Sequence, residues 1–281
     1  MFKKILDVLA DTASHHAYTS SLYSLLNILS KREVATSGFQ LENNIVPFGH
    51  FGEISFPYKK MGAVDTLDLF GLDELIIFSY YWVNRDRYVR AADLGANLGL
   101  HSILMSRCGW DVLAFEPDPM HSDLLRANLK RNGIQNVVLD QAAVSDKAGF
   151  LEFVRVLGNT TGSHLAGAKR NPYGDLQRFP VDVRTIHDIM LAVDFIKLDV
   201  EGQEKIILLA TESMHWAKTD MILEIGSKEN AEAIFDHISN IGVNIFSQKA
   251  GWRKVELVDQ MPSNYAEGSC FISKKSEMLW D

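Results

Sequence analysis

The run Asp93–Gly99, with the sequence Asp-Leu-Gly-Ala-Asn-Leu-Gly, decides the fold of this chain of 281 residues. It follows an apolar stretch, Val89–Leu94, that is typical of a short buried strand, and it opens a helical pattern that continues to Arg107. A glycine turn between a strand and a helix lets a ligand approach the backbone closely. The helix N-terminus adds unpaired N–H groups. The sequence therefore predicts a ligand-binding turn at the carboxyl end of a strand.

Strands and helices alternate beyond this turn. The pattern predicts strands over Asp111–Phe115 and Val137–Leu139, and between them a helix over Pro119–Asn132 that stops at Gly133. Further strands are predicted over 195–200, 221–225, 243–246, 254–257 and 269–273. The alternation favours an α/β fold with a parallel sheet and helices on both faces, and the last strands, which have no long helices between them, favour an antiparallel edge.

The residues that precede this core follow a different pattern. Apolar steps of three and four residues predict a helix over 2–31, short strands follow over 41–58, and helical spacing returns over 65–83. We therefore predict an N-terminal extension of helix and short strands over 1–64, and a second domain over 65–281.

Composition narrows the class of protein. Hydrophobic residues make up 47% of the chain, enough for a sizeable core, and 28 Lys and Arg against 36 Asp and Glu give a charge of −8. A net negative charge without a basic run predicts no binding to nucleic acid. The two cysteines, Cys108 and Cys270, predict free thiols in a reducing compartment. With no long apolar run and no signal-peptide pattern, we expect a cytoplasmic protein without integral membrane contact.

An acidic residue ends the next predicted strand. Glu116 lies 116 − 93 = 23 positions after Asp93, where an acid of a nucleotide-binding fold takes the ribose hydroxyls, and Pro117 sets the turn that follows. A surface acid that caps the next helix is the simpler alternative. A dehydrogenase would need glycines at the first, third and sixth positions of the turn. Here these are Gly95, Asn97 and Leu100, so a nicotinamide-dependent oxidoreductase is the second interpretation.

The third chemical signal is the run 194–202, which contains Asp199 and Glu201 at the end of a predicted strand. Ligands of open α/β sheets bind at the carboxyl ends of the strands, and alternate residues of a strand face the same side. Both acids are therefore expected to face the cleft, where either is able to bind substrate or take a proton. A helix-capping role for Glu201 is the alternative.

Four ordered motifs resemble those of the FkbM family of S-adenosylmethionine-dependent methyltransferases. They are Asp93–Gly99, Phe115–Pro117, Ala143–Gly149 and Lys197–Gly202, and the resemblance covers roughly residues 70–227. It implies a class I methyltransferase (Rossmann-like) fold, with a seven-stranded, mostly parallel sheet flanked by helices and an antiparallel last strand.

The resemblance also implies S-adenosyl-L-methionine as cofactor. The cofactor-binding residues that it implies are Asp93, Gly95, Ala96, Asn97, Gly99, Glu116, Pro117, Ala142, Ala143 and Asp199. Asp199 and Glu201 match the acidic motif beside the transferred methyl. His101 and His164, in or after the cleft loops, are two further candidates for a catalytic base. No specific metal signature is present, and we predict no metal site.

The implied reaction is O-methylation of a hydroxyl on a sugar, a glycan or a secondary metabolite. Besides the oxidoreductase, a non-catalytic binding domain that keeps the cofactor fold stays open as an alternative. The expected partner is a small-molecule or glycan acceptor, and the N-terminal extension is a candidate surface for a homodimer.

Overall fold

The computed structural model describes residues 1–41, 44–168 and 174–280. In this part of the chain the main sheet has the order β13-β12-β14-β11-β10-β3-β4-β5. The bounds are β3 Arg90–Leu94, β4 Asp111–Phe115, β5 Val137–Asp140, β10 Phe195–Leu198, β11 Asp220–Glu224, β12 Asn244–Ser247, β13 Arg253–Lys254 and β14 Ser269–Ser273. Strand β10 pairs in parallel with β3 and β11, whereas β14 runs antiparallel to β11. With the two-residue β13 set aside, this is the expected seven-stranded sheet, and the class I fold is confirmed.

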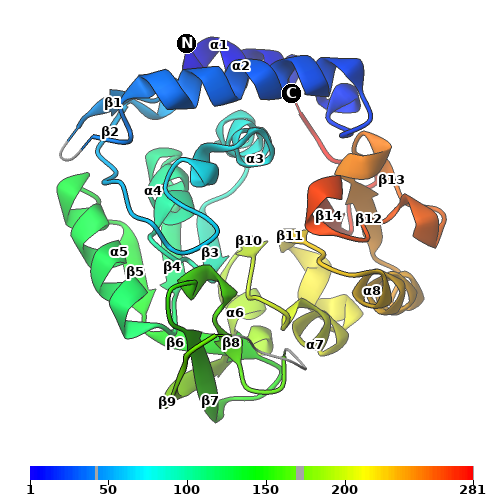
Figure 1. The fold of residues 1–281 in the computed structure, drawn as a ribbon. Coiled ribbons are helices and arrows are strands. Elements are labelled where there is room, and N and C mark those ends of the chain that lie inside the picture. The colour runs from blue at the N-terminus through cyan, green and yellow to red at the C-terminus, as the bar shows by residue number, and fades with distance from the viewer. Residues whose placement is uncertain (42–43, 169–173, 281) are drawn as a thin grey trace.

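Helices cover both faces of this sheet (Figure 1). On one side lie α3 Leu72–Val83, α4 Leu100–Arg107 and α5 Pro119–Arg131, and on the other α6 Ile186–Ala192, α7 Glu204–Leu209 and α8 Lys228–Asn240. Because successive strand residues point to opposite faces, Phe195 packs into the core with α3 and α4, and Ile196 into the core with α6, α7 and α8. Both faces are therefore apolar, as in other α/β sheets.

The N-terminal helix predicted over 2–31 is wrong in its middle, because two helices form. Helix α1 covers Phe2–Asp11 and α2 covers Ser21–Ser37. The hydroxyl of Thr12 donates to the carbonyl of Val8 at 2.6 Å, and a 3₁₀ turn over Ala13–His15 follows. Such side-chain bonds to the backbone compete with the helix, and this segment of small polar residues and histidines does not continue it.

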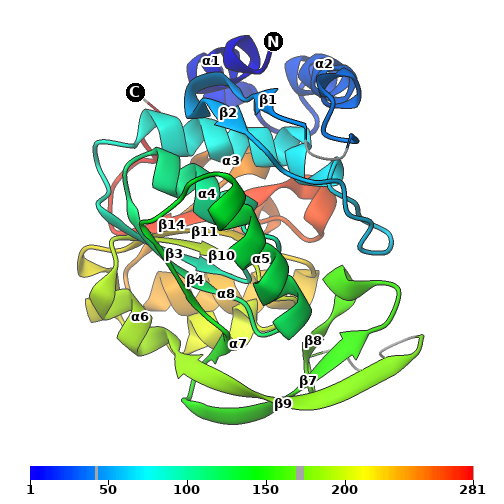
Figure 2. The same cartoon turned by 90° about the vertical axis from the view of Figure 1, so that its left-hand side faces the viewer.

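Helix α1 joins the extension to the rest of the molecule. Its apolar side, which includes Phe2 and Leu9, packs against α3 in the same core as one face of the sheet, and Ser79 donates to the Leu6 carbonyl at 2.8 Å. Figure 2 shows α1 and α2 above α3, at the end of the molecule opposite β7 and β9. The division at residue 64 stays a prediction.

Helix α3 begins later than predicted. A 3₁₀ turn over Asp68–Phe70 and then Gly71 precede it, so the expected start at residue 65 is wrong. The short strands expected over 41–58 form as the hairpin of β1 Val46–Pro47 and β2 Glu53–Ile54. Cys108 and Cys270 are free thiols, as predicted. No helix among the described residues is long and apolar enough to cross a membrane.

A second sheet, inserted between β5 and β10, has no counterpart in the sequence prediction. Its order is β6-β9-β7-β8, with β6 Ala142–Ser145, β7 Gly149–Val156, β8 His164–Leu165 and β9 Leu176–Thr185. Figure 2 shows β7 and β9 as a long ribbon below the main sheet. Its apolar core is small, and Phe150 and Leu151 of β7 are exposed. The alternation that would reveal the strand is therefore weak.

Candidate active site

A cavity of about 440 Å³ lies where β3, β4, β10 and β11 end, within the size range of small-ligand sites. We call its inner side the floor, formed by the turns after these strands and by β6: Gly95, Asn97, Phe115–Asp118, Ala142–Val144, Asp199–Glu201, Gln203 and Glu224. We call the opposite side the outer wall: Val64, Asp68, Leu69, Glu74, Thr160, Thr161, Ser163–Leu165 and Tyr265.

The turn after β3 is held by the neighbouring strand. The N–H groups of Gly95 and Ala96 donate to the Phe115 carbonyl at 3.0 and 2.9 Å, and the N–H of Asn97 donates to Glu116 at 2.9 Å. These three donors are therefore used by the protein, and the ligand-binding role of the turn stays a prediction. Gly95 has φ +80°, and a Cβ there would lie 1.8 Å from the Asp199 carbonyl oxygen. Position 95 therefore requires glycine, because the Asp199 carbonyl leaves no room for a side chain.

Glu116 joins two turns of the floor. One carboxylate oxygen accepts from the N–H of Asn97 and the other from the N–H of Asp118, each at 2.9 Å. Burial raises the pKa of Glu116 to about 8, although the two backbone donors oppose this. Pro117 lines the cavity beside it. Glu116 thus holds the two turns together, a role that sequence reasoning did not assign to it.

Asp199 and Glu201 both line the cavity, but the reason given from strand alternation is wrong. Strand β10 ends at Leu198, so both acids lie in the turn that follows, and Glu201 has φ +40°. Lys197 donates to Asp199 at 3.0 Å. Burial lowers the pKa of Lys197, but the carboxylates of Asp199 and its neighbours outweigh this and raise it. A buried ammonium therefore contacts Asp199 of the floor.

Several residues of the site escaped the sequence prediction, and Glu204 and Tyr265 are two of them. Glu204 accepts hydrogen bonds from the N–H groups of Val200 and Gly202 at 3.0 to 3.2 Å, and so fixes the turn that carries Asp199 and Glu201. Burial raises its pKa to about 7. An acid in the first turn of a helix is a recognisable signal for such capping. Tyr265 reaches the outer wall from the segment before β14, and no local pattern marks it.

The structure separates the two candidate histidines. His164 lines the cavity from β8, and its Nδ1 lies 3.0 Å from the Gly162 carbonyl oxygen, so that Nε2 is the unprotonated nitrogen of the neutral ring. His101 does not line it. This side chain lies behind Glu74, with Nε2 2.9 Å from a Glu74 oxygen and Nδ1 2.9 Å from the Tyr81 hydroxyl.

Three of the predicted cofactor-binding residues also lie outside the cavity lining. Asp93 is buried beneath the turn and accepts from Ser102 at 2.6 Å. Ala96 is buried, and a Cβ at Gly99 would lie 2.7 Å from Leu125 of α5, so that Gly99 serves helix packing. The other seven predicted residues line the cavity: Gly95, Asn97, Glu116, Pro117, Ala142, Ala143 and Asp199.

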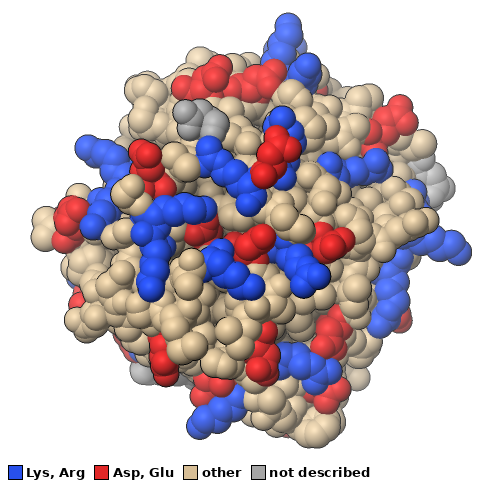
Figure 3. All heavy atoms as spheres, turned by 180° about the vertical axis from the view of Figure 1, so that it is seen from behind, with Lys and Arg blue, Asp and Glu red and all other residues tan. Residues whose placement is uncertain are grey.

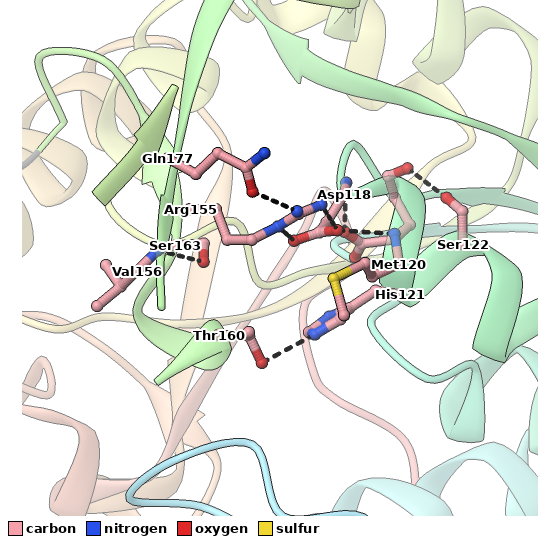
Figure 4. Close-up of polar contacts among 10 residues, drawn as sticks. Asp118, Met120, His121, Ser122, Arg155, Val156, Thr160, Ser163 and Gln177 are labelled. Atoms are coloured by element: carbon pink, nitrogen blue, oxygen red, sulfur yellow. Dashed lines mark hydrogen bonds and ion pairs between the residues drawn. The ribbon is translucent and has the colours of Figure 1, made fainter. Parts of the chain in front are cut away.

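A buried ion pair fixes the second sheet against the floor. Arg155 of β7 binds both carboxylate oxygens of Asp118, which also caps α5, and donates to Gln177 at 2.8 Å (Figure 4). His121 lies 2.9 Å from the hydroxyl of Thr160 in the outer wall. Figure 4 shows these side chains bridging the β7 region and the start of α5. The inserted sheet is therefore part of the site.

The charged side chains of the cavity indicate which kind of ligand it binds. Seven carboxylates line it, and no Lys or Arg does among the described residues. The acids are Asp68, Glu74, Glu116, Asp118, Asp199, Glu201 and Glu224. In addition, the side-chain oxygen of Asn97 is buried without a hydrogen-bond donor. Such a lining fits a cationic ligand that carries N–H donors, as S-adenosylmethionine does, and it disfavours the diphosphate of a nicotinamide cofactor.

The fold and the cavity define an α/β protein with a nucleotide-type site at the carboxyl ends of its strands. Residues 93–250, 158 of the 281, match the family model described as the FkbM methyltransferase domain. The chain belongs to this family and is an S-adenosylmethionine-dependent methyltransferase.

Curated relatives agree. Methyltransferase sdnD of Sordaria araneosa is 26% identical over 201 aligned residues, covering 57% of this chain and 75% of the relative. The 31-O-demethyl-FK506 methyltransferase FkbM of Streptomyces tacrolimicus is 27% identical over 164 residues, covering 47% of this chain and 62% of the relative.

Solved structures give weaker likenesses. An O-methyltransferase from Bacillus cereus in complex with SAH has a TM-score of 0.37 and 13% identity, covering 69% of this chain and 78% of that one. A precorrin-6y C5,15-methyltransferase from Geobacter metallireducens has a TM-score of 0.35 and 16% identity, covering 61% and 73%.

Proposed function

We propose that the chain methylates a hydroxyl oxygen of a small-molecule or glycan acceptor. The observation that carries the proposal is the presence of Asp199 and Glu201 together in the cavity floor, opposite an outer wall that carries further polar side chains. When bound, S-adenosylmethionine supplies a methyl group on a positively charged sulfur. The chain must then position the acceptor, exclude water and hold the hydroxyl proton.

The floor divides into two parts for this purpose. Glu116, Pro117, Ala142 and Ala143 form a partly apolar end with one buried acid, which suits the adenosine. Asp199 and Glu201 lie at the acidic end, which suits the charged part of the cofactor. Asp93, Ala96 and Gly99 support the cofactor indirectly, by shaping the turn after β3.

Three side chains are candidates for the base that takes the hydroxyl proton. Asp199, Glu201 and His164 all line the cavity. Lys197 donates to Asp199 at 3.0 Å, so one oxygen of that carboxylate already has a partner inside the protein. His101 acts at most as a positioning residue, because Glu74 lies between it and the cavity.

The test uses amides of matched size. In Asp199→Asn and Glu201→Gln, methyl transfer to an acceptor verified with the wild type should fall by about 10²-fold, at the low end of general-base contributions. Melting temperature and S-adenosylhomocysteine binding should persist. Glu256→Gln changes an exposed acid outside the cavity and is the control. Full turnover in both cavity amides would overturn the assignment, and a pH–rate profile separates a base from a positioning residue.

For partners and location we propose a cytoplasmic homodimer that binds no nucleic acid. The exposed apolar side chains of Leu25 and Ile28 on α2 support a dimer through the extension. Figure 3 supports the exclusion of nucleic acid, since Lys and Arg are interspersed with Asp and Glu over the face it shows. Light scattering of the wild type and of Leu25→Asp tests the dimer, and a monomeric wild type contradicts it.

A further inference from the structure

Three carboxylates line the acidic end of the cavity, and a fourth is buried beneath the turn after β3. Asp199 and Glu224 lie at the ends of the neighbouring strands β10 and β11, and Glu74 comes from the first turn of α3. Asp93 is fully buried at the end of β3, and one of its oxygens has no hydrogen-bond partner. The family model begins at residue 93, so Glu74 lies outside the matched segment.

Positive charge is scarce around these carboxylates. Lys197 binds Asp199 at 3.0 Å, and the imidazole of His101 lies 2.9 Å from Glu74. Neither Lys197 nor His101 lines the cavity, and no Lys or Arg lines it among the described residues. One ammonium and one imidazole therefore face four carboxylates. A partly buried group of carboxylates favours a cationic ligand over a neutral one, because desolvated charges interact strongly.

The protonation of Glu224 agrees with this shortage of positive charge. Burial, and next the charges of Asp199 and Glu74, raise its pKa well above the usual range. The charged or titratable groups that face it are Asp199 and Lys197 near β10, Glu74 and Asp73 on α3, and Tyr265. Burial and the neighbouring carboxylates therefore both favour the protonated form of Glu224.

We propose that Glu224 and Glu74 select the cationic cofactor over its uncharged product. S-adenosylmethionine carries a positive sulfur and S-adenosylhomocysteine a neutral one, and the rest of the two molecules is the same apart from the methyl. The cavity then binds the cofactor about tenfold more tightly than the product, which favours product release. The inference depends on the cofactor alone and not on the acceptor proposed above.

A pH dependence follows from the same geometry. A cation beside Glu224 favours the carboxylate, so binding of S-adenosylmethionine releases a proton to the solvent. Below the pKa of Glu224 the ligand must displace that proton, and its affinity therefore rises as the pH increases from 6 to 9. The neutral sulfur of S-adenosylhomocysteine gains less from the ionised carboxylate, and its affinity changes less.

Isothermal titration of the whole chain tests the proposal. S-adenosylmethionine, S-adenosylhomocysteine and sinefungin, which carries an ammonium in place of the methylated sulfur, are titrated at pH 6, 7.5 and 9. Two buffers of different ionisation enthalpy report the protons released. We expect both cations to bind about tenfold more tightly than S-adenosylhomocysteine at pH 9, with about one proton released at pH 7.5.

Variants assign the selectivity to residues. Glu224→Gln and Glu74→Gln should each reduce the tenfold preference, and Glu224→Gln should also abolish the proton release. Glu256→Gln changes an exposed acid outside the cavity and should alter the preference by less than twofold.

Each outcome of the titration decides a different point. Equal affinities of wild type for S-adenosylmethionine and S-adenosylhomocysteine, or an unchanged preference in a folded Glu224→Gln, overturn the proposal. If both amide variants unfold, the proton release of the wild type decides alone. If none of the three ligands binds, the cofactor site itself is contradicted. That outcome is distinct from binding without selectivity.

Discussion

The floor and the outer wall of the cavity arise from different kinds of sequence. The floor comes from short turns directly after parallel strands, and Gly95, Glu116 and Asp199 lock these turns to one another. The outer wall comes from segments far apart in the chain, near residues 64–74, 160–165 and 265. Side chains such as His121, facing Thr160, hold it in place.

The difference separates the part of the cavity suited to the cofactor from the part suited to the acceptor. A turn between a parallel strand and its helix is short and has little conformational choice, so the floor suits the cofactor that all members of the class share. Loops held by side chains tolerate substitution, so the outer wall suits the acceptor. Floor variants that displace the backbone of these turns should therefore abolish cofactor binding, and wall variants should spare it.

The largest effect is expected at Gly95. In Gly95→Val the new Cβ collides with the carbonyl oxygen of Asp199, so the backbone of one of the two turns must move. We expect a loss of stability above about 3 kcal/mol, from overpacking and strain combined, and no detectable S-adenosylhomocysteine binding. Urea unfolding and titration measure both.

Gly133→Ala is the matched control for Gly95→Val. Gly133 also has positive φ, but a Cβ there meets nothing within 4 Å. It should cost only about 1 kcal/mol and leave binding intact. Similar losses in the two variants would show that backbone conformation alone matters at Gly95.

Removal of the buried ion pair is expected to have the next largest effect. Arg155→Met leaves Asp118 charged and buried, which costs about 3–5 kcal/mol. Arg178→Met, in the neighbouring strand β9, removes an exposed pair with Glu152 and should cost less than about 1 kcal/mol. Equal stabilities of the two variants in urea would contradict the role given to Arg155.

The pH dependence of stability should be smaller. Burial raises the pKa of Glu116 to about 8 and of Glu204 to about 7 in the folded chain. A raised carboxyl pKa means that the folded state binds more protons, so this stability is present below about pH 4.5 and is lost as pH rises through 7 to 8. The free energy of unfolding should fall between pH 5 and pH 9, by on the order of 2 kcal/mol for each carboxyl. In Glu204→Gln the free energy of unfolding should fall less steeply with pH than in the wild type. A steeper fall in this variant would contradict the raised pKa of Glu204.

The smallest effect is expected in the outer wall. Thr160→Val removes the hydroxyl that contacts His121 and keeps the shape of the side chain. We expect a cost of about 1 kcal/mol and less than a twofold change in S-adenosylhomocysteine affinity. A tenfold loss of affinity would abolish the distinction between floor and wall.

The sequence predicts the main sheet well because its strands are short apolar runs that end at glycine or acidic turns. The starts of β4 at Asp111 and of α5 at Pro119 match the prediction, since Pro at the first position of a helix is a strong signal. The start of α3 at Leu72 was predicted too early, because the apolar periodicity of the helix continues back through the 3₁₀ turn that precedes it. Local pattern alone does not separate the turn from the helix.

The site was predictable only where a motif is continuous in sequence. Glu116 and Asp199 follow from their strands, but the contact between Glu74 and His101 joins α3 to α4. The approach of Arg155 to Asp118 likewise depends on the second sheet, whose strand β7 is exposed over its first four residues and buried over its last four. These contacts arise from tertiary packing, and no spacing in the chain encodes them.

A crystal structure of the chain with S-adenosylhomocysteine tests the central claim most directly, because it places every floor residue against the ligand. The account predicts the ribose hydroxyls within hydrogen-bond distance of Glu116, the adenine beside Ala142 and Ala143, and the amino-acid end near Asn97 and Asp199. A ligand bound outside the floor, or a ribose that makes no contact with Glu116, would contradict it.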